Sequence, residues 1–237
     1  MNYSEYVTQM ATMAVVDPTD TYFLTILPQM LNYAELRMQR DIDFLSTVVT
    51  DTNYALTTGN PFLTIADGDF VVLQSISLSS TSPHAPLLPV TREYLQYVWP
   101  QGGVNGVPVC FAMQGGDLAT VGNTSILVRV GPSPDQNYTL SITGTKREPT
   151  LYQPATPTAT TFISNYLPDI LIMASMIYIS AYQRNFGRMS DDPSMSVSYE
   201  SQYQALLKGA MVEEARKKFQ AGAWSSMSPA IAATPTR

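Results

Sequence analysis

The sequence predicts an α+β protein with an N-terminal helix, a central antiparallel β-region, a C-terminal antiparallel helical hairpin and an extended tail. Apolar residues recur every three or four positions near both ends of the chain, which indicates helices. In the middle, apolar residues alternate with hydroxyl residues between dense Gly and Pro turn signals, which indicates strands. We expect four segments: 1–44 helical, 45–150 β-rich, 158–221 a helical hairpin, and 222–237 an extended tail.

Two helices are predicted in the first segment. A short helix over residues 4–15 is stopped by an Asp-Pro pair, and a longer one covers residues 22–44. Asp20 or Thr19 can cap the longer helix, because their side-chain oxygens accept hydrogen bonds from the first turn. Pro28 lies inside this helix and predicts a kink or a restart there.

The β-region is indicated by short apolar runs between turns. Tyr138, Leu140 and Ile142 alternate with hydroxyl residues, as in a half-buried strand. Thr91 is the expected N-cap of a short helix over residues 92–99 within this region. The other apolar runs are 62–65, 70–76, 107–113 and 125–130.

The C-terminal segment is predicted as a pair of helices. Residues 162–186 form a helix or helix pair that is apolar on nearly every side, and Pro168 and Asp169 suit a first helical turn. Residues 197–220 form a long amphipathic helix. A helix that is apolar all round must be covered on several sides, so we expect neighbouring subunits to complete its cover.

Composition narrows the function classes. Charged residues make up 14% of the chain, the formal net charge is −6, and there is no basic block, so groove or backbone recognition of nucleic acid is not expected. Cys110 is the single cysteine, which excludes an intramolecular disulfide and fits a reducing compartment. The first residues lack a secretory pattern, and the apolar run 170–181 is too short to span a bilayer. We therefore expect a protein made in a cytoplasm, without a membrane segment.

The residues for catalysis or metal binding are scarce. His84 is the only histidine and lies in a turn, so no Ser-His-acid set can be built without it. Asp67 and Asp69 flank a turn glycine rather than a calcium loop, and Cys110 is expected to be a buried or interface residue. A carboxylate pair for glycoside hydrolysis stays open, because it requires only proximity in the fold. We predict no enzyme, no cofactor and no metal.

Two aromatic features have alternative interpretations. The tail containing Trp224 and Met227 is either a disordered terminus or a peptide that orders on a partner. Tyr94, Tyr97 and Trp99 form either part of a core or a platform for sugar rings.

An ordered set of segments resembles the head-to-tail adaptor (connector) proteins of short-tailed bacteriophages, which join portal to tail. The set begins with Arg40-Asp41-Ile42-Asp43-Phe44 at the end of the first helical segment. It ends with Thr160-Thr161-Phe162-Ile163-Ser164-Asn165-Tyr166-Leu167-Pro168-Asp169 ahead of a helical hairpin. Between them lie Pro86-Leu87-Leu88-Pro89-Val90-Thr91-Arg92-Glu93-Tyr94-Leu95, Gly106-Val107-Pro108-Val109-Cys110-Phe111-Ala112 and Val130-Gly131-Pro132-Ser133-Pro134-Asp135-Gln136-Asn137-Tyr138. The order covers about residues 20–220, and the two ends of the chain depart from the family pattern.

The resemblance implies a structural protein of the virion neck, assembled in the bacterial host cytoplasm. It implies a homo-oligomeric ring, usually of twelve copies, that binds the portal, meets tail, nozzle or tail-fibre proteins, and extends the channel through which genomic DNA passes. No catalytic residue is implied. Two alternatives are a carbohydrate-binding or cell-wall-cleaving virion protein that uses the β-region, and a chaperone or internal virion protein.

We expect the two C-terminal helices and the tail to supply the portal or subunit interface, and loops of the β-region to contact the tail proteins. The residues expected at that interface are Phe162, Ile163, Tyr166, Tyr203, Leu207, Trp224, Met227 and Arg237.

Overall fold

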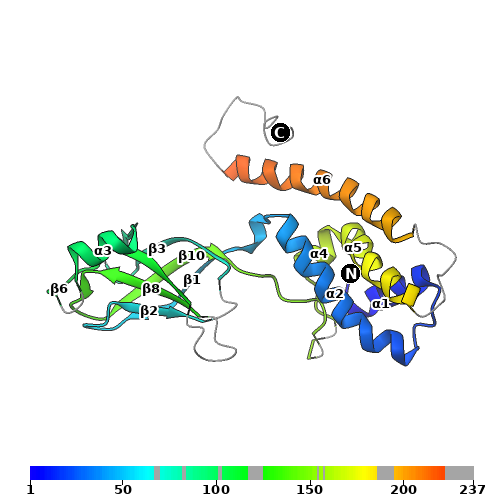
Figure 1. The fold of residues 1–237 in the computed structure, drawn as a ribbon, viewed down its shortest axis with the longest axis horizontal. Helices are drawn as coiled ribbons and strands as arrows, with labels where there is room; N and C mark the ends of the chain where they lie inside the picture. The colour runs from blue at the N-terminus through cyan, green and yellow to red at the C-terminus, as the bar shows by residue number, and fades with distance from the viewer. Residues whose placement is uncertain are drawn as a thin grey trace. The chain divides into compact units, whose positions relative to one another are not determined.

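The computed structural model confirms the predicted α+β class and divides the chain into two compact units (Figure 1). The helical unit contains residues 1–46 and the chain from Glu148 onward, and the β-unit contains Thr47–Arg147. The structure describes residues 1–66, 70–81, 84–100, 103–116, 125–153, 155–156, 158–185 and 195–221.

The helical unit is built from both ends of the chain. Its helices are α1 (Tyr3–Ala14), α2 (Thr21–Asp41), α4 (Phe162–Tyr166), α5 (Pro168–Asn185) and α6 (Met195–Ala221). Asn2 and Glu5 form a capping box at the start of α1, and Asp20 caps α2 by accepting hydrogen bonds from two backbone N–H groups. The helix α2 continues through Pro28 without the restart that the sequence left open.

All of these helices contribute to one apolar core. The helix α2 contributes a row of buried apolar residues spaced three or four positions apart, as the sequence predicts. The buried residues include Tyr6, Met10, Phe23, Leu27, Leu31, Ala34, Met38, Ile163, Leu171, Ala174, Met176, Ile179, Tyr203, Leu207 and Ala210. The two ends of the chain therefore depend on each other for burial of their apolar faces.

The chain itself covers most of α5. This helix packs on α1, α2, α4 and α6, and its buried side chains point into the shared core. The side chains of Ile172, Met173, Ile177 and Tyr178 are half-buried. In the described part of α5, neighbouring subunits could therefore cover only the side that carries these four half-buried residues.

In the described residues of the β-unit, the strands form two four-stranded sheets and a two-stranded one. Its strands are β1 (Val48–Leu56), β2 (Phe62–Ile65), β3 (Val72–Leu78), β4 (Ala85–Pro86), β5 (Leu88–Pro89), β6 (Asn105–Gly106), β7 (Cys110–Gly116), β8 (Ile126–Gly131), β9 (Ser133–Pro134) and β10 (Tyr138–Thr145). The strand orders are β1-β10-β3-β4, β2-β8-β7-β5 and β6-β9. Pairing is antiparallel except for the short pairs β5–β7 and β6–β9, which are parallel.

The two four-stranded sheets share one core. Ile76, Leu140 and Ile142 come from the first sheet, and Val128 and Val130 come from the second. The alternation predicted for β10 is observed, because its apolar side chains are buried while the intervening hydroxyl residues are not. A smaller cluster beside this core holds the helix α3 (Arg92–Val98), whose N-cap is Thr91 as predicted.

Two glycines with opposite surroundings give a first test of the packing. A Cβ atom at Gly209 in α6 would meet no atom within 4 Å, whereas one at Gly144 in β10 would lie 2.4 Å from the carbonyl oxygen of Val72. We expect Gly209→Ala to stabilise the helical unit by about 0.5–1 kcal/mol, because glycine costs conformational entropy in a helix interior. Urea unfolding followed by far-UV circular dichroism measures this.

The reverse change at Ala205, which is exposed on the same helix, serves as the matched control. Ala205→Gly is expected to destabilise the unit by a similar amount. Equal stabilities for both variants and the parent chain would mean that α6 is not formed in the free protein.

Candidate interaction surface of the helical unit

The structure places the predicted interface residues of the C-terminal helices at different depths. Ile163, Tyr203 and Leu207 are buried in the core of their own chain, and Phe162 is half-buried. Tyr166 at the end of α4 is 70% exposed, so of these five it is the one fully available to a partner. Trp224, Met227 and Arg237 lie outside the described residues.

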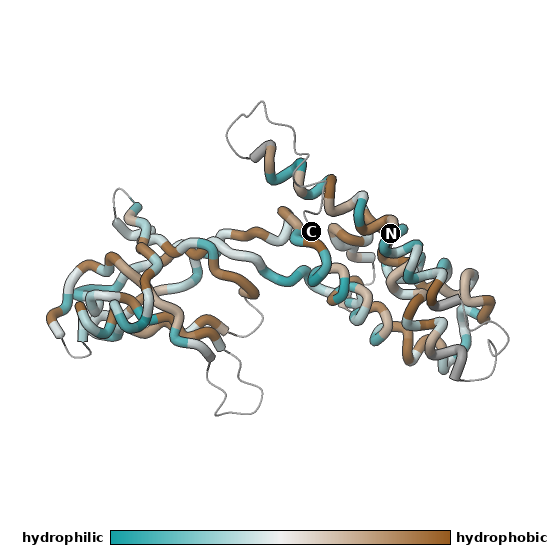
Figure 2. Tube along the Cα trace, turned by 45° about the horizontal axis from the view of Figure 1, so that its top comes forward, coloured by the Kyte–Doolittle hydropathy of each residue, from teal (hydrophilic) through white to brown (hydrophobic). Residues whose placement is uncertain are grey.

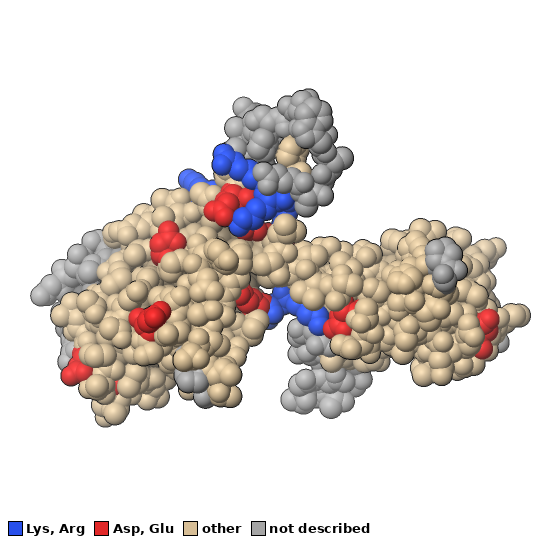
Figure 3. All heavy atoms as spheres, turned by 180° about the vertical axis from the view of Figure 1, so that it is seen from behind, with Lys and Arg blue, Asp and Glu red and all other residues tan. Residues whose placement is uncertain are grey.

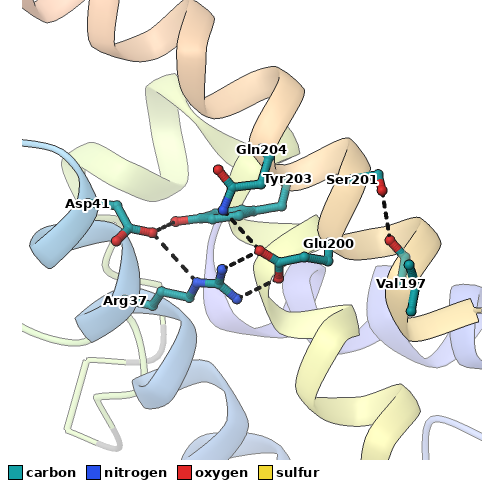
Figure 4. Close-up of polar contacts among 7 residues, drawn as sticks. All are labelled: Arg37, Asp41, Val197, Glu200, Ser201, Tyr203 and Gln204. Carbon is teal, nitrogen blue, oxygen red and sulfur yellow. Dashed lines mark hydrogen bonds and ion pairs between the residues drawn. The ribbon is translucent and has the colours of Figure 1, made fainter. Parts of the chain in front are cut away.

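An ionic network fastens α6 to α2. The guanidinium of Arg37 donates two hydrogen bonds to Glu200, at 2.8 and 2.6 Å, and lies 4.5 Å from the ring centroid of Tyr203 (Figure 4). The hydroxyl of Tyr203 donates to a carboxylate oxygen of Asp41 at 2.7 Å, and Arg37 also approaches Asp41 at 3.6 Å. Hydrogen bonding to Arg37 lowers the pKa of Glu200, so this carboxylate stays charged across the neutral range.

A second set of contacts ties the C-terminal half of α6 to the chain after α2. The buried carboxylate of Glu214 accepts a hydrogen bond from the backbone N–H of Leu45 at 3.0 Å. Lys218 forms an ion pair with Asp43, and the ammonium of Lys217 lies 5.3 Å from the ring centroid of Phe162. Five of the six ion pairs among the described residues involve α2, α6 or the link after α2.

The sequence carried a signal for this network. Charges are scarce in the chain, yet they gather at the end of α2 and in the last turns of α6. The signal did not reveal that the two groups meet, because Arg37 and Glu200 are 163 positions apart. In Figure 2 the tube of α6 mixes hydrophilic and hydrophobic residues along its length, which agrees with a helix that uses both kinds of contact.

The carboxylates of Glu35 and Glu148 lie in the helical unit where residues 148–151 contact α2. Glu35 is 3% exposed and accepts a hydrogen bond from the N–H of Leu151 at 2.8 Å, while its second oxygen has no described partner. Burial, with a smaller contribution from the negative charge of Glu148, raises the pKa of Glu35 to about 7. Burial also raises the pKa of Glu148, which accepts a hydrogen bond from the N–H of Phe162 at the start of α4.

The structure places His84 and Cys110 in surroundings that are not typical of catalytic residues. His84 is exposed, Cys110 is buried in a strand, and burial raises the pKa of its thiol, which disfavours the reactive thiolate. Across the described ranges, no three His, Cys, Asp or Glu side chains group closely enough to hold a metal ion. No described helix is long and apolar enough to cross a membrane.

The chain is similar to one known protein family over nearly all of its length. The family model described as SU10 adaptor protein matches residues 1–230, which is nearly the whole chain. The chain belongs to this family. A comparison with curated proteins found no match.

Membership makes this protein a phage adaptor, a structural protein with a role in connecting portal and tail. The resemblance to head-to-tail adaptors seen in the sequence is therefore confirmed. The match includes the region in which the adaptor's helical unit, its ionic network and its β-unit lie, so these features belong to the family region of the chain.

Proposed function

We propose that this adaptor forms a closed ring that seats on the portal, extends the DNA channel and presents a platform for tail proteins in the virion neck. The observation that carries the proposal is the family match over residues 1–230.

The surface of the helical unit supports assembly. Tyr166, Val197, Met211 and Phe219 are large apolar residues that remain exposed on its C-terminal helices. Of these, Tyr166 and Val197 are the most exposed, at 70% and 65%, and exposed apolar side chains of this kind can anchor a partner. The formal net charge of −6 also suits a channel through which DNA slides, because lining cations would retain phosphate groups.

The proposal is tested by mixing the full chain with purified portal and measuring mass by light scattering during size-exclusion chromatography. We expect a stoichiometric complex in which the adaptor copies match the symmetry of the portal ring. Tyr166→Ser is expected to weaken the complex at least about tenfold if this side chain is an anchor. An adaptor that stays monomeric and free in the presence of portal would overturn the proposal.

The alternative function, carbohydrate binding by the β-unit, has one supporting observation. A cavity of about 320 Å³ beside α3 is lined by Trp99, Pro100 and Pro132, with Asn105 and Ser133 as polar groups. Binding of a soluble glycan that is lost in Trp99→Ala, a change in the wall of this cavity, would favour this alternative over the connector.

A further inference from the structure

The turn that joins α1 to α2 exposes apolar side chains at the cost of strain. Val15 ends α1 with φ 54°, and its side chain is 87% exposed. A β-branched residue is strongly disfavoured in this left-handed conformation, where glycine or asparagine normally ends a helix. Residues held in such sparsely populated backbone conformations cluster at functional sites.

The surroundings of Val15 are apolar and acidic. Tyr22 in the first turn of α2 is 80% exposed, and Met13 in the last turn of α1 is also exposed. Asp17 is exposed in the turn, and residues 1–36 contain no Lys or Arg. We call Met13, Val15, Asp17 and Tyr22 the α1–α2 corner.

A second surface has the opposite charge. Lys208, Arg216 and Phe219 are exposed on the side of α6 that points away from its core residues, given 3.6 residues per turn, and Met211 is exposed on the flank of the helix next to them. We call these four residues the α6 outer face. Lys208 and Arg216 make no ion pair within the described part of the chain, whereas Lys217 and Lys218 do.

The two surfaces are complementary but separated. One offers apolar side chains with a carboxylate, and the other offers apolar side chains with two cations that form no ion pair among the described residues. In Figures 1 and 2 the α1–α2 turn and the C-terminal end of α6 lie at opposite ends of the helical unit. On the face shown in Figure 3, Lys and Arg gather near the C-terminal end of α6 beside some Asp and Glu, and further Asp and Glu are scattered over the rest of the helical unit. A second copy of the chain can supply what each surface lacks.

We propose that the α1–α2 corner of one copy docks on the α6 outer face of the next copy. This contact joins two different surfaces, so it repeats from copy to copy rather than stopping at a dimer, and it closes a ring when the rotation between copies divides a full turn. The inference rests on the ring of the proposed function and names the surfaces that join its subunits. The strain at Val15 is then retained because its side chain packs against the neighbouring copy.

Val15→Asn separates the folding role from the assembly role of this residue. Asparagine adopts the left-handed conformation more readily, so the urea midpoint of the free chain is expected to rise. Loss of the apolar contact is expected to raise the adaptor concentration for half-saturated ring assembly on portal about tenfold. Val104→Asn is the matched control, because Val104 is 88% exposed in the β-unit, and it should leave assembly unchanged.

Unchanged assembly in Val15→Asn, or an equal loss in Val104→Asn, would overturn the inference. The wild-type result separates it from the proposed function. If the wild-type chain binds portal as a ring and Val15→Asn does so equally well, only the named contact is wrong. If the wild-type chain does not bind portal, the proposed function fails, and self-association of the free chain at high concentration, measured by sedimentation, decides the contact.

A double-mutant cycle tests the charge pairing between copies. Asp17→Asn keeps the oxygen that accepts hydrogen bonds from Thr19 but removes the charge, and Arg216→Gln removes the opposite charge. Each change is expected to weaken assembly about threefold, and the double variant should weaken it little more than either single one. Effects that simply multiply would show that the two charges do not meet. Arg147→Gln, at an exposed arginine of the β-unit, is the control.

Discussion

Replacing Glu35 by glutamine is expected to stabilise the helical unit by about 2 kcal/mol at pH 8. The carboxyl group of Glu35 has an ordinary pKa of 4.5 and a pKa of about 7 in the fold, because burial disfavours its charged form. This difference corresponds to about 3 kcal/mol between the two protonation states. Glutamine keeps an oxygen that accepts the hydrogen bond from Leu151 and carries no charge, although its amide group must find a partner.

The direction of the pKa shift at Glu35 determines how the stability of the helical unit changes with pH. Because the pKa of Glu35 is raised by folding, its full contribution to stability is present below pH 4.5 and is lost as the pH rises towards 7. The parent chain should therefore lose stability between pH 5 and pH 8, and the glutamine variant should lose much less. At pH 5 the two proteins are expected to differ by less than about 1 kcal/mol.

Urea unfolding at both pH values, followed at the helical signal in circular dichroism, measures this difference. Glu93→Gln changes an exposed carboxylate in the first turn of α3 and is the control, expected to stay within about 0.5 kcal/mol at either pH. A variant that is destabilised at pH 8 would mean that the charged form of Glu35 is held by a partner that outweighs its burial.

The helix starts were predictable because they depend on neighbouring residues. Asp20 and Thr91 cap helices where the sequence predicted, and α5 begins at Pro168, whose missing N–H is not needed there. The predicted end of α1, at residue 15, was less accurate. Val15 adopts the left-handed conformation after the helix, and a β-branched residue is not expected in that conformation.

Strand bounds were predicted less well than strand existence. The run 62–65 matches β2, but the run 70–76 is displaced from β3 and the run 107–113 from β7. The register of a strand is set by its partner in the ladder, and apolar runs do not specify the partner. For the same reason the parallel pairing of β5 with β7 was not foreseen.

The main feature that the sequence could not predict is which elements pack against α5. Periodicity showed a helix that is apolar on nearly every side, but it could not say that α1, α2 and α6 of the same chain supply most of the cover. As a consequence, Tyr203 and Leu207 were expected at an interface, while the structure buries both in the core. The α1–α2 corner lies in a turn, where periodicity gives no signal, and the amphipathic pattern of residues 197–220 predicts an exposed face on α6 but not what that face contacts.

Replacing Tyr203 by alanine is expected to destabilise the helical unit by about 3–5 kcal/mol and to release α6. The side chain of Tyr203 is fully buried between α6 and the rest of the unit, and truncation of a large buried aromatic residue removes apolar contact and leaves a cavity. Tyr203→Phe keeps the ring and loses only the hydrogen bond to Asp41, so it is expected to cost about 1 kcal/mol.

Comparing Tyr203→Ala with Arg37→Met shows whether apolar packing or the ionic network holds α6 against the rest of the helical unit. The pair of Arg37 with Glu200 is partly exposed, so its removal is expected to cost only about 1 kcal/mol. Limited proteolysis within α6, together with urea unfolding, measures both variants, and Tyr97→Ala at an exposed tyrosine of the β-unit is the control. If Arg37→Met frees α6 as fully as Tyr203→Ala does, the ionic network rather than apolar packing holds the helix. In that case high salt should release α6 as well, because screening weakens exposed ion pairs and leaves burial largely unaffected.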